Sequence, residues 1–172
     1  MFINKVSRLG YFFCLLLATF PIIALEGDTK EPVTLESDSG FFDDKEGVSI
    51  YMGDVIIIQG SLRMDADKVV IYMDDKREIQ KMIATGNLVK IKQTAEEGKK
   101  SLHGRALTIN YNPLKRLLVM TGSAVLWRGG NKTASEFIEY DLESEIIKAG
   151  DSKLSDKRVH VTLQPNSEPS TE

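Results

Sequence analysis

Apolar and polar residues alternate along most of this chain, from Val33 to Leu163. The alternation is clear in the segments VTLE at 33–36, LRMD at 62–65 and ALTINY at 106–111. A period of two residues is typical of β-strands that bury one face. Gly, Asp, Asn and Pro separate the runs about every 8–12 residues, which predicts about 12–16 short strands. The pattern therefore favours an all-β, antiparallel chain folded as a sandwich, a jelly roll or a solenoid.

A short motif recurs at the ends of four of these runs: Ile or Val, two residues, then Gly. Its glycines are Gly53, Gly86, Gly122 and Gly150, about 30 residues apart, which is a spacing found in repeat proteins. Such a repeat buries its apolar face only when its neighbours stack on it. We expect each Gly to supply a positive φ or a bulge where a strand turns a corner. The alternative is that these are ordinary hairpin glycines.

Aligning the motif on its glycines assigns side chains to the two faces of the sheet. Apolar residues recur three positions before each Gly, and three and five positions after most of them. Because successive side chains of a strand point to opposite faces, we expect these positions inside and Lys90 and Lys92 in solvent. The predicted inward set is Ile50, Ile56, Ile58, Val69, Ile71, Ile83, Val89, Ile91, Leu107, Ile109, Tyr111, Val119, Val125, Trp127, Ile138 and Tyr140.

Residues 1–24 differ in character from the rest. Lys5 and Arg8 precede an almost wholly apolar run from Gly10 to Ile23, and Ala24 follows it. This is the pattern of a secretory signal peptide, cleaved after Ala24. The run is shorter than the ~20 residues of a membrane-spanning helix, although a retained anchor is the alternative. We expect residues 25–32 to be a linker, 33–165 the β domain, and 166–172 a disordered tail rich in Pro, Ser and Glu.

The amino-acid composition limits the classes of partner and the cellular compartment that the protein can have. The formal net charge of the whole chain is −3, and removal of Lys5 and Arg8 with the signal peptide makes it more negative. An acidic balance argues against a nucleic-acid partner. The one cysteine, Cys14, lies in the predicted signal peptide, so neither a disulfide nor a reactive thiol is expected in the exported chain. In a bacterium with two membranes, export places the protein in the periplasm.

The sequence contains no arrangement typical of catalysis. His103 and His160 lack a second histidine, a cysteine or paired carboxylates at metal-ligand spacing. Asp65 and Asp67 resemble a carboxylate pair, but their place on a strand edge favours a solvated turn over acid–base catalysis. Nothing resembles a nucleophile with its base and orienting group. We therefore predict no enzyme activity, no metal and no cofactor.

Several segments resemble the OstA-like family of periplasmic lipopolysaccharide-transport bridge proteins. They are residues 32–38, 53–69, 118–124 and 157–165, in order along nearly the whole exported chain, and the most specific is 59–69. The resemblance implies an open, twisted β-jellyroll with a V-shaped section. It also implies that an apolar interior groove holds the lipid A acyl chains of lipopolysaccharide, with Val33 and Leu35 at its mouth and Tyr111 against lipid.

The resemblance further implies two docking edges. The N-terminal edge, Val33, Thr34, Leu35 and Glu36, would pair with the inner-membrane component of the export machinery. The C-terminal edge, Val159, Val161 and Leu163, would pair with the N-terminal domain of the outer-membrane translocon, and copies could stack head to tail as a homo-oligomer. Two other readings stay open. One is an inner-membrane-anchored relative that retains residues 1–24, and the other is a periplasmic β scaffold whose filled core binds no lipid.

Overall fold

The computed structural model describes residues 31–94, 100–150 and 158–165. Within these ranges the chain forms ten strands, and no helix there is long and apolar enough to cross a membrane. The predicted signal peptide, most of the linker and the tail lie outside the described residues. The strands are β1 (Val33–Glu36), β2 (Ser39–Asp43), β3 (Val48–Gln59), β4 (Leu62–Met73), β5 (Ile79–Gln93), β6 (Leu102–Asn112), β7 (Leu117–Arg128), β8 (Asn131–Asp141), β9 (Ile147–Ala149) and β10 (His160–Thr162).

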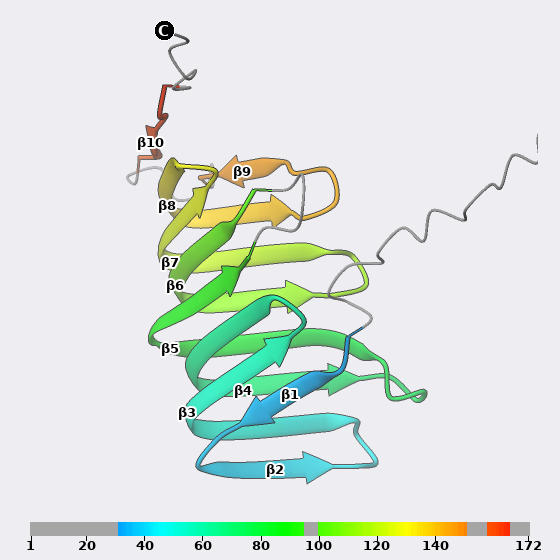
Figure 1. The fold of residues 1–172 in the computed structure, drawn as a ribbon. Helices are drawn as coiled ribbons and strands as arrows, with labels where there is room; N and C mark the ends of the chain where they lie inside the picture. Colours follow the sequence, from blue (N-terminus) through cyan, green and yellow to red (C-terminus); the bar gives the residue numbers. More distant parts are fainter. Residues whose placement is uncertain (1–30, 95–99, 151–157, 166–172) are drawn as a thin grey trace, which may run out of the picture.

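All ten strands belong to one antiparallel sheet in the order β1-β3-β4-β5-β6-β7-β8-β10. Figure 1 shows them stacked from β2 at the bottom to β10 at the top. Each end of the stack divides into two short strands. At one end β1 and β2 both pair with β3, and at the other end β9 and β10 both pair with β8. The predicted all-β, open antiparallel jellyroll is therefore confirmed.

The long strands β3–β8 bend near their middles, so the sheet folds into two facing arms (Figure 1). The register is interrupted at this corner in every pair from β3/β4 to β7/β8. The first arm consists of β1, β10 and residues 55–59, 62–66, 89–93, 102–106, 124–128 and 131–135. The second arm consists of β2, β9 and residues 48–52, 68–73, 79–85, 108–112, 117–121 and 137–141.

Three of the four motif glycines, Gly53, Gly86 and Gly122, lie at these corners, as predicted. Gly53 and Gly122 have φ of 84° and 81°, a backbone conformation that would be strained in a residue with a side chain. Gly150, which follows β9, has φ of 87°. Gly86 lies in the register shift of β5 without a positive φ. The predicted strand number is wrong, because the chain continues through each corner as a single strand. β5 alone has 15 residues, where the turn spacing indicated 8–12.

Apolar side chains fill the space between the arms and form one core. A row of fully buried side chains crosses the second arm: Val69, Ala84, Ile109, Met120 and Ile138. A facing row crosses the first arm: Ile57, Met64, Ile91, Gly104 and Leu126. Each fully buried aliphatic side chain of this kind contributes roughly 1.5–3 kcal/mol to folding. The core therefore holds the two arms together.

The structure confirms part of the predicted inward set and corrects the rest. The residues on the inner face are Val33, Leu35, Val69, Ile71, Val89, Ile91, Ile109, Tyr111, Ile138 and Tyr140. Val125 is also buried, at 8% exposure, although it lies outside the main core cluster. The residues on the outer face or at a corner are Ile50, Ile56, Ile58, Ile83, Leu107, Val119 and Trp127. For this second group the predicted inward orientation is wrong. Their sequence neighbours lie inside instead: Ser49, Tyr51, Val55, Ile57, Met82, Ala84, Ala106, Leu118, Met120 and Leu126.

Two physical effects explain the error. On the outer face Ile50 and Ile83 are both register partners of Val70, and β-branched side chains stabilise an extended strand there by packing on one another. Apolar identity alone therefore did not distinguish the faces. In addition, the corner of β5 changes which alternate residues face inward, from Ala84 before it to Val89 after it. An alignment on the glycines cannot detect that change.

Candidate binding cleft between the arms

The mouth of the V is the gap between the free edges of the two arms. An open cleft of about 620 Å³ lies there. The first arm lines it with Val33 and Gln59, and the second arm lines it with Ile79 and Met82 and with Leu114 in the β6–β7 turn. Leu114 is 59% exposed. The mouth therefore presents apolar side chains to solvent at a place where a ligand could reach the core.

A second cleft, of about 540 Å³, opens at the β1/β2 end of the stack. Its lining is mostly apolar: Val33, Leu35, Phe42, Tyr51, Ile71, Met73 and Ile79, with Asp44, Ser49 and Arg77 as the polar members. Arg77 forms an ion pair with Asp44 and lies 5.3 Å from the centroid of the Phe42 ring. Because Val33 and Ile79 line both clefts, the apolar side chains form a continuous surface from the end of the stack to the mouth, where Glu31, Glu78 and Arg116 also line the cleft.

The opposite end of the stack is bridged by polar side chains. Arg128, at the end of β7 in the first arm, forms an ion pair with Glu145 in the β8–β9 turn of the second arm. Its guanidinium also lies 5.7 Å from the ring centroid of Tyr140. Burial raises the pKa of the Tyr140 hydroxyl, and the positive charge of Arg128 opposes that rise. Burial by itself would lower the pKa of Arg128, but its hydrogen bond to Glu145 leaves that pKa raised. This ion pair connects the two arms at its own end of the stack, whereas the cleft keeps them apart at the β1/β2 end.

Away from these two clefts, the interior around Gly104 is close-packed. A Cβ built on Gly104 would lie 2.9 Å from the Met120 Cε of the opposite arm. Three methionines, Met64, Met82 and Met120, are buried in this region. Methionine has an unbranched, flexible side chain that adapts to irregular space. A ligand between the arms would therefore have to displace these side chains.

The predicted docking edges lie at the two ends of the stack. Val33, Thr34, Leu35 and Glu36 form β1, whose other side pairs with no strand among the described residues. Val161 lies in β10 at the opposite end and is 56% exposed. Val159 and Leu163 flank that strand and are also exposed. Unpaired strand edges of this kind can accept a strand from another chain.

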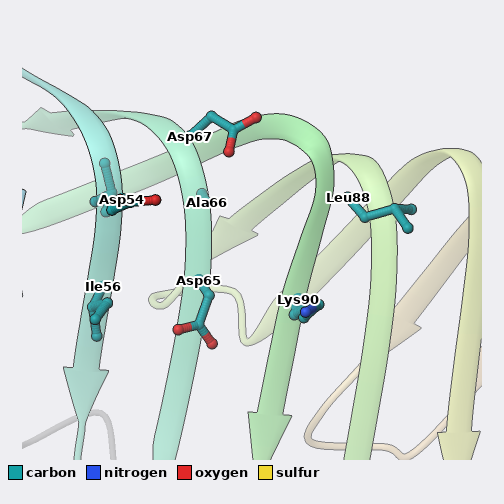
Figure 2. A pocket seen from close by; sticks show the side chains of 8 residues that line it. Asp54, Ile56, Asp65, Ala66, Asp67, Leu88 and Lys90 are labelled. Atoms are coloured by element: carbon teal, nitrogen blue, oxygen red, sulfur yellow. The ribbon is translucent and has the colours of Figure 1, made fainter.

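A further depression lies on the outside of the first arm, away from the core. It has a volume of about 350 Å³ and is bordered by Asp54, Val55, Ile56, Asp65, Ala66, Asp67, Leu88 and Lys90. Figure 2 shows Ile56, Asp65 and Lys90 side by side on three neighbouring strands, as the register also places them. Charged groups line this depression, so it differs in character from the apolar clefts. Among the described residues no group of three or more histidine, cysteine or acidic side chains is placed to hold a metal ion.

The folded-over sheet with apolar clefts defines the protein as an open β-jellyroll. The family described as "LptA/(LptD N-terminal domain) LPS transport protein" matches residues 34–146. The chain belongs to this family, and the predicted OstA-like resemblance is confirmed. Lipopolysaccharide export system protein LptA of Escherichia coli K12 is 31% identical over 165 residues, covering 95% of this chain and 88% of that protein. LptH of Pseudomonas aeruginosa, described in the same words, is 29% identical over 148 residues, covering 83% of this chain and 85% of that protein.

The fold is also that of a solved relative. The crystal structure of LptH from Pseudomonas aeruginosa superposes with a TM-score of 0.73 at 28% identity, covering 80% of this chain and 99% of the other. That structure is described as "the LptA homologous periplasmic component of the conserved lipopolysaccharide transport device". The relatives named here are transport proteins.

Proposed function

We propose that this protein carries lipopolysaccharide between the inner- and outer-membrane components of the export machinery. The apolar surface that runs from the β1/β2 end to the mouth is the observation that supports this role. Each methylene withdrawn from water contributes about 0.8 kcal/mol, so shielding several acyl chains saves tens of kcal/mol. A V-shaped sheet can shield the chains while the sugar portion stays in solvent at the mouth.

Acyl chains would enter through the mouth, where the arms are already apart. Further in, they would replace contacts such as that between Gly104 and Met120. The flexible side chains of Met64, Met82 and Met120 could then pack against lipid as well as against one another. In this view the close-packed interior is the lipid-free state of the binding site.

The docking edges would place copies and partners end to end. We propose that β1 pairs with a strand of the inner-membrane component, and that the edge at Val161 pairs with the N-terminal domain of the outer-membrane translocon. Head-to-tail pairing of two copies would use the same edges. Main-chain hydrogen bonds supply the affinity in such strand addition, and it would align the apolar clefts of successive proteins.

This role requires export. We propose that residues 1–24 are a signal peptide cleaved after Ala24 and that the exported protein works in the periplasm. The charge and hydropathy pattern of the segment supports this, as does the periplasmic description of the Pseudomonas aeruginosa relative.

One observation favours a second candidate function. Because the interior is close-packed, the protein could be a periplasmic scaffold that binds no lipid. Native and denaturing mass spectrometry of the protein purified from the periplasm separates the candidates. We expect a chain that begins at Leu25 and forms a complex with added lipopolysaccharide. A chain that begins at Leu25 but never forms this complex would support the scaffold, and a chain that begins at Met1 would support the anchored relative.

A further inference from the structure

The outer face of the first arm carries a concentration of positive charge that the lipid-carrying role does not use. We call it the basic face: the cations Arg63, Lys90, Lys92, Arg105 and Lys132, with His103 and Trp127 among them. All are exposed except Trp127, which is half-buried. The chain as a whole has a formal net charge of −3, so this concentration is local.

Two cross-strand pairs on the basic face are unfavourable for the isolated protein. Lys90 lies directly opposite Arg105, and Arg63 directly opposite Lys92. Like charges in cross-strand pairs destabilise a sheet. Asp65 offsets part of this charge, because it binds Arg63 at 2.6 and 3.2 Å and lies directly opposite Lys90, and Glu36 also attracts Arg63. Among the described residues, Lys90, Lys92 and Arg105 have no ion-pair partner. An anionic partner would relieve the repulsion.

Trp127 lies in the middle of the basic face. The guanidinium of Arg105 lies 5.5 Å from its ring centroid, and the ammonium of Lys132 lies 5.8 Å from it. A shallow depression of about 460 Å³ runs beside Trp127 over Lys92 and His103. Tryptophan is enriched where proteins meet the head groups of a membrane, because its ring is amphipathic.

The outer face of the second arm has no such concentration. There Lys148 forms an ion pair with Glu139 at 2.8 Å. The ammonium of Lys81 lies 4.3 Å from the ring centroid of Tyr72. The two outer faces therefore differ in charge although they belong to one sheet.

We infer that the basic face docks the protein on a membrane surface containing anionic phospholipids. Its cations are exposed, lie on long side chains and are spread over β4–β8. Because they are dispersed, they can contact many mobile lipid head groups at once, whereas a single bound anion would need them to converge. Each lysine or arginine near such a surface strengthens binding roughly five-fold. The basic face lies opposite the core, so docking through it would leave the mouth and both clefts accessible.

Vesicle binding tests the inference without lipopolysaccharide, so its outcome is independent of the proposed transport role. The protein is titrated with vesicles of phosphatidylcholine alone or mixed equally with phosphatidylglycerol, and fluorescence of Trp127, the only tryptophan in the chain, reports contact. We expect the protein to bind only the anionic vesicles, with a blue shift of the Trp127 emission. Salt near ~1 M should release the protein, because interactions between charges then extend only about 3 Å. The triple variant Lys92→Gln/Arg105→Gln/Lys132→Gln should bind roughly 100-fold more weakly.

The matched control is Lys68→Gln/Lys81→Gln/Lys148→Gln, which removes the same charge from the second arm. It should retain most of the binding. Equal binding to both vesicle types, an equal loss in the control, or displacement by millimolar inorganic phosphate would overturn the inference. So would binding to lipopolysaccharide aggregates but not to phosphatidylglycerol. If the triple variant does not fold, the unmodified protein still decides, because an unshifted Trp127 emission on anionic vesicles contradicts docking through this face.

Discussion

Gly104 of the first arm and Met120 of the second arm meet inside the fold. A Cβ on Gly104 would lie 2.9 Å from the Met120 Cε and 2.9 Å from the Ile91 Cγ2, which is closer than carbon atoms pack. The arms come together at this point because residue 104 has no side chain. Lipid between the arms would have to separate the same two residues.

Substituting Gly104 by alanine should therefore destabilise the protein. The added methyl group must displace Met120 or Ile91, and such overpacking costs about 1–3 kcal/mol of unfolding free energy. Urea unfolding measures this cost. In a Met120→Ala background only the close approach to Ile91 remains, so the same substitution should cost less. An equal cost in both backgrounds would contradict the contact.

Ile57 and Ile58 provide a test of which face of β3 is internal. Ile57 is fully buried and Ile58 is 40% exposed, although they are adjacent and chemically identical. Ile57→Ala should lower the unfolding free energy by about 2–5 kcal/mol through lost burial and an added cavity. Ile58→Ala should cost less than about 1 kcal/mol. Similar costs for the two variants, measured by urea unfolding, would show that the assignment of the faces is wrong.

The bridge between Arg128 and Glu145 should slow the entry of lipid, because it ties the arms together. The Glu145 side chain is 49% exposed, so the ion pair is worth at most about 1 kcal/mol. Glu145→Gln should change stability little and accelerate lipopolysaccharide uptake by up to about five-fold. Stopped-flow uptake measures the rate. Lys148→Gln is the control, because it removes an ion pair within the second arm, and an equal acceleration in that variant would exclude a role for the bridge.

The β8–β9 turn should lose stability in acid. The Asp141 carboxylate accepts hydrogen bonds from the backbone N–H groups of Ser144 and Glu143, each at 2.9 Å, and these bonds lower its pKa. A lowered folded-state pKa contributes stability above the unfolded-state value near 3.9, and the contribution disappears as the pH falls through the folded-state value. The stability difference between wild type and Asp141→Ala should thus be constant above about pH 5 and shrink below about pH 4. An NMR titration giving Asp141 a pKa of 3.9 or more would contradict this.

The architecture could be predicted from the sequence because it depends on the alternation of apolar and polar residues and on the positions of the motif glycines. Alternation from Val33 to Leu163 predicted antiparallel strands, and the motif glycines predicted the corners, where Gly53 and Gly122 have positive φ. Both signals are local: they depend on neighbours a few residues away. The segments that resemble the family added the open, folded-over form of the sheet.

The residues of the inner face could be predicted from the sequence only in part. Val69, Ile109 and Ile138 were placed correctly, but Met82 and Met120 were missed, because β-branched neighbours gave a stronger strand signal on the outer face. The parity change at the corner of β5 depends on how that strand pairs with β6, which a single sequence does not specify. The ion pair between Arg128 and Glu145 is a tertiary contact between the two arms, so no local sequence pattern predicted it.

Photo-crosslinking at two tyrosines of the second arm tests the central claim most directly. Tyr51 lines the cleft at the β1/β2 end, whereas Tyr72 lies on the outer face, and both are half-buried. Each can be replaced by the aromatic crosslinker p-benzoylphenylalanine with little change of shape. If the interior carries acyl chains, irradiation with lipopolysaccharide should give an adduct at residue 51 and essentially none at residue 72. Equal yields at the two positions, or an adduct only at residue 72, would contradict it.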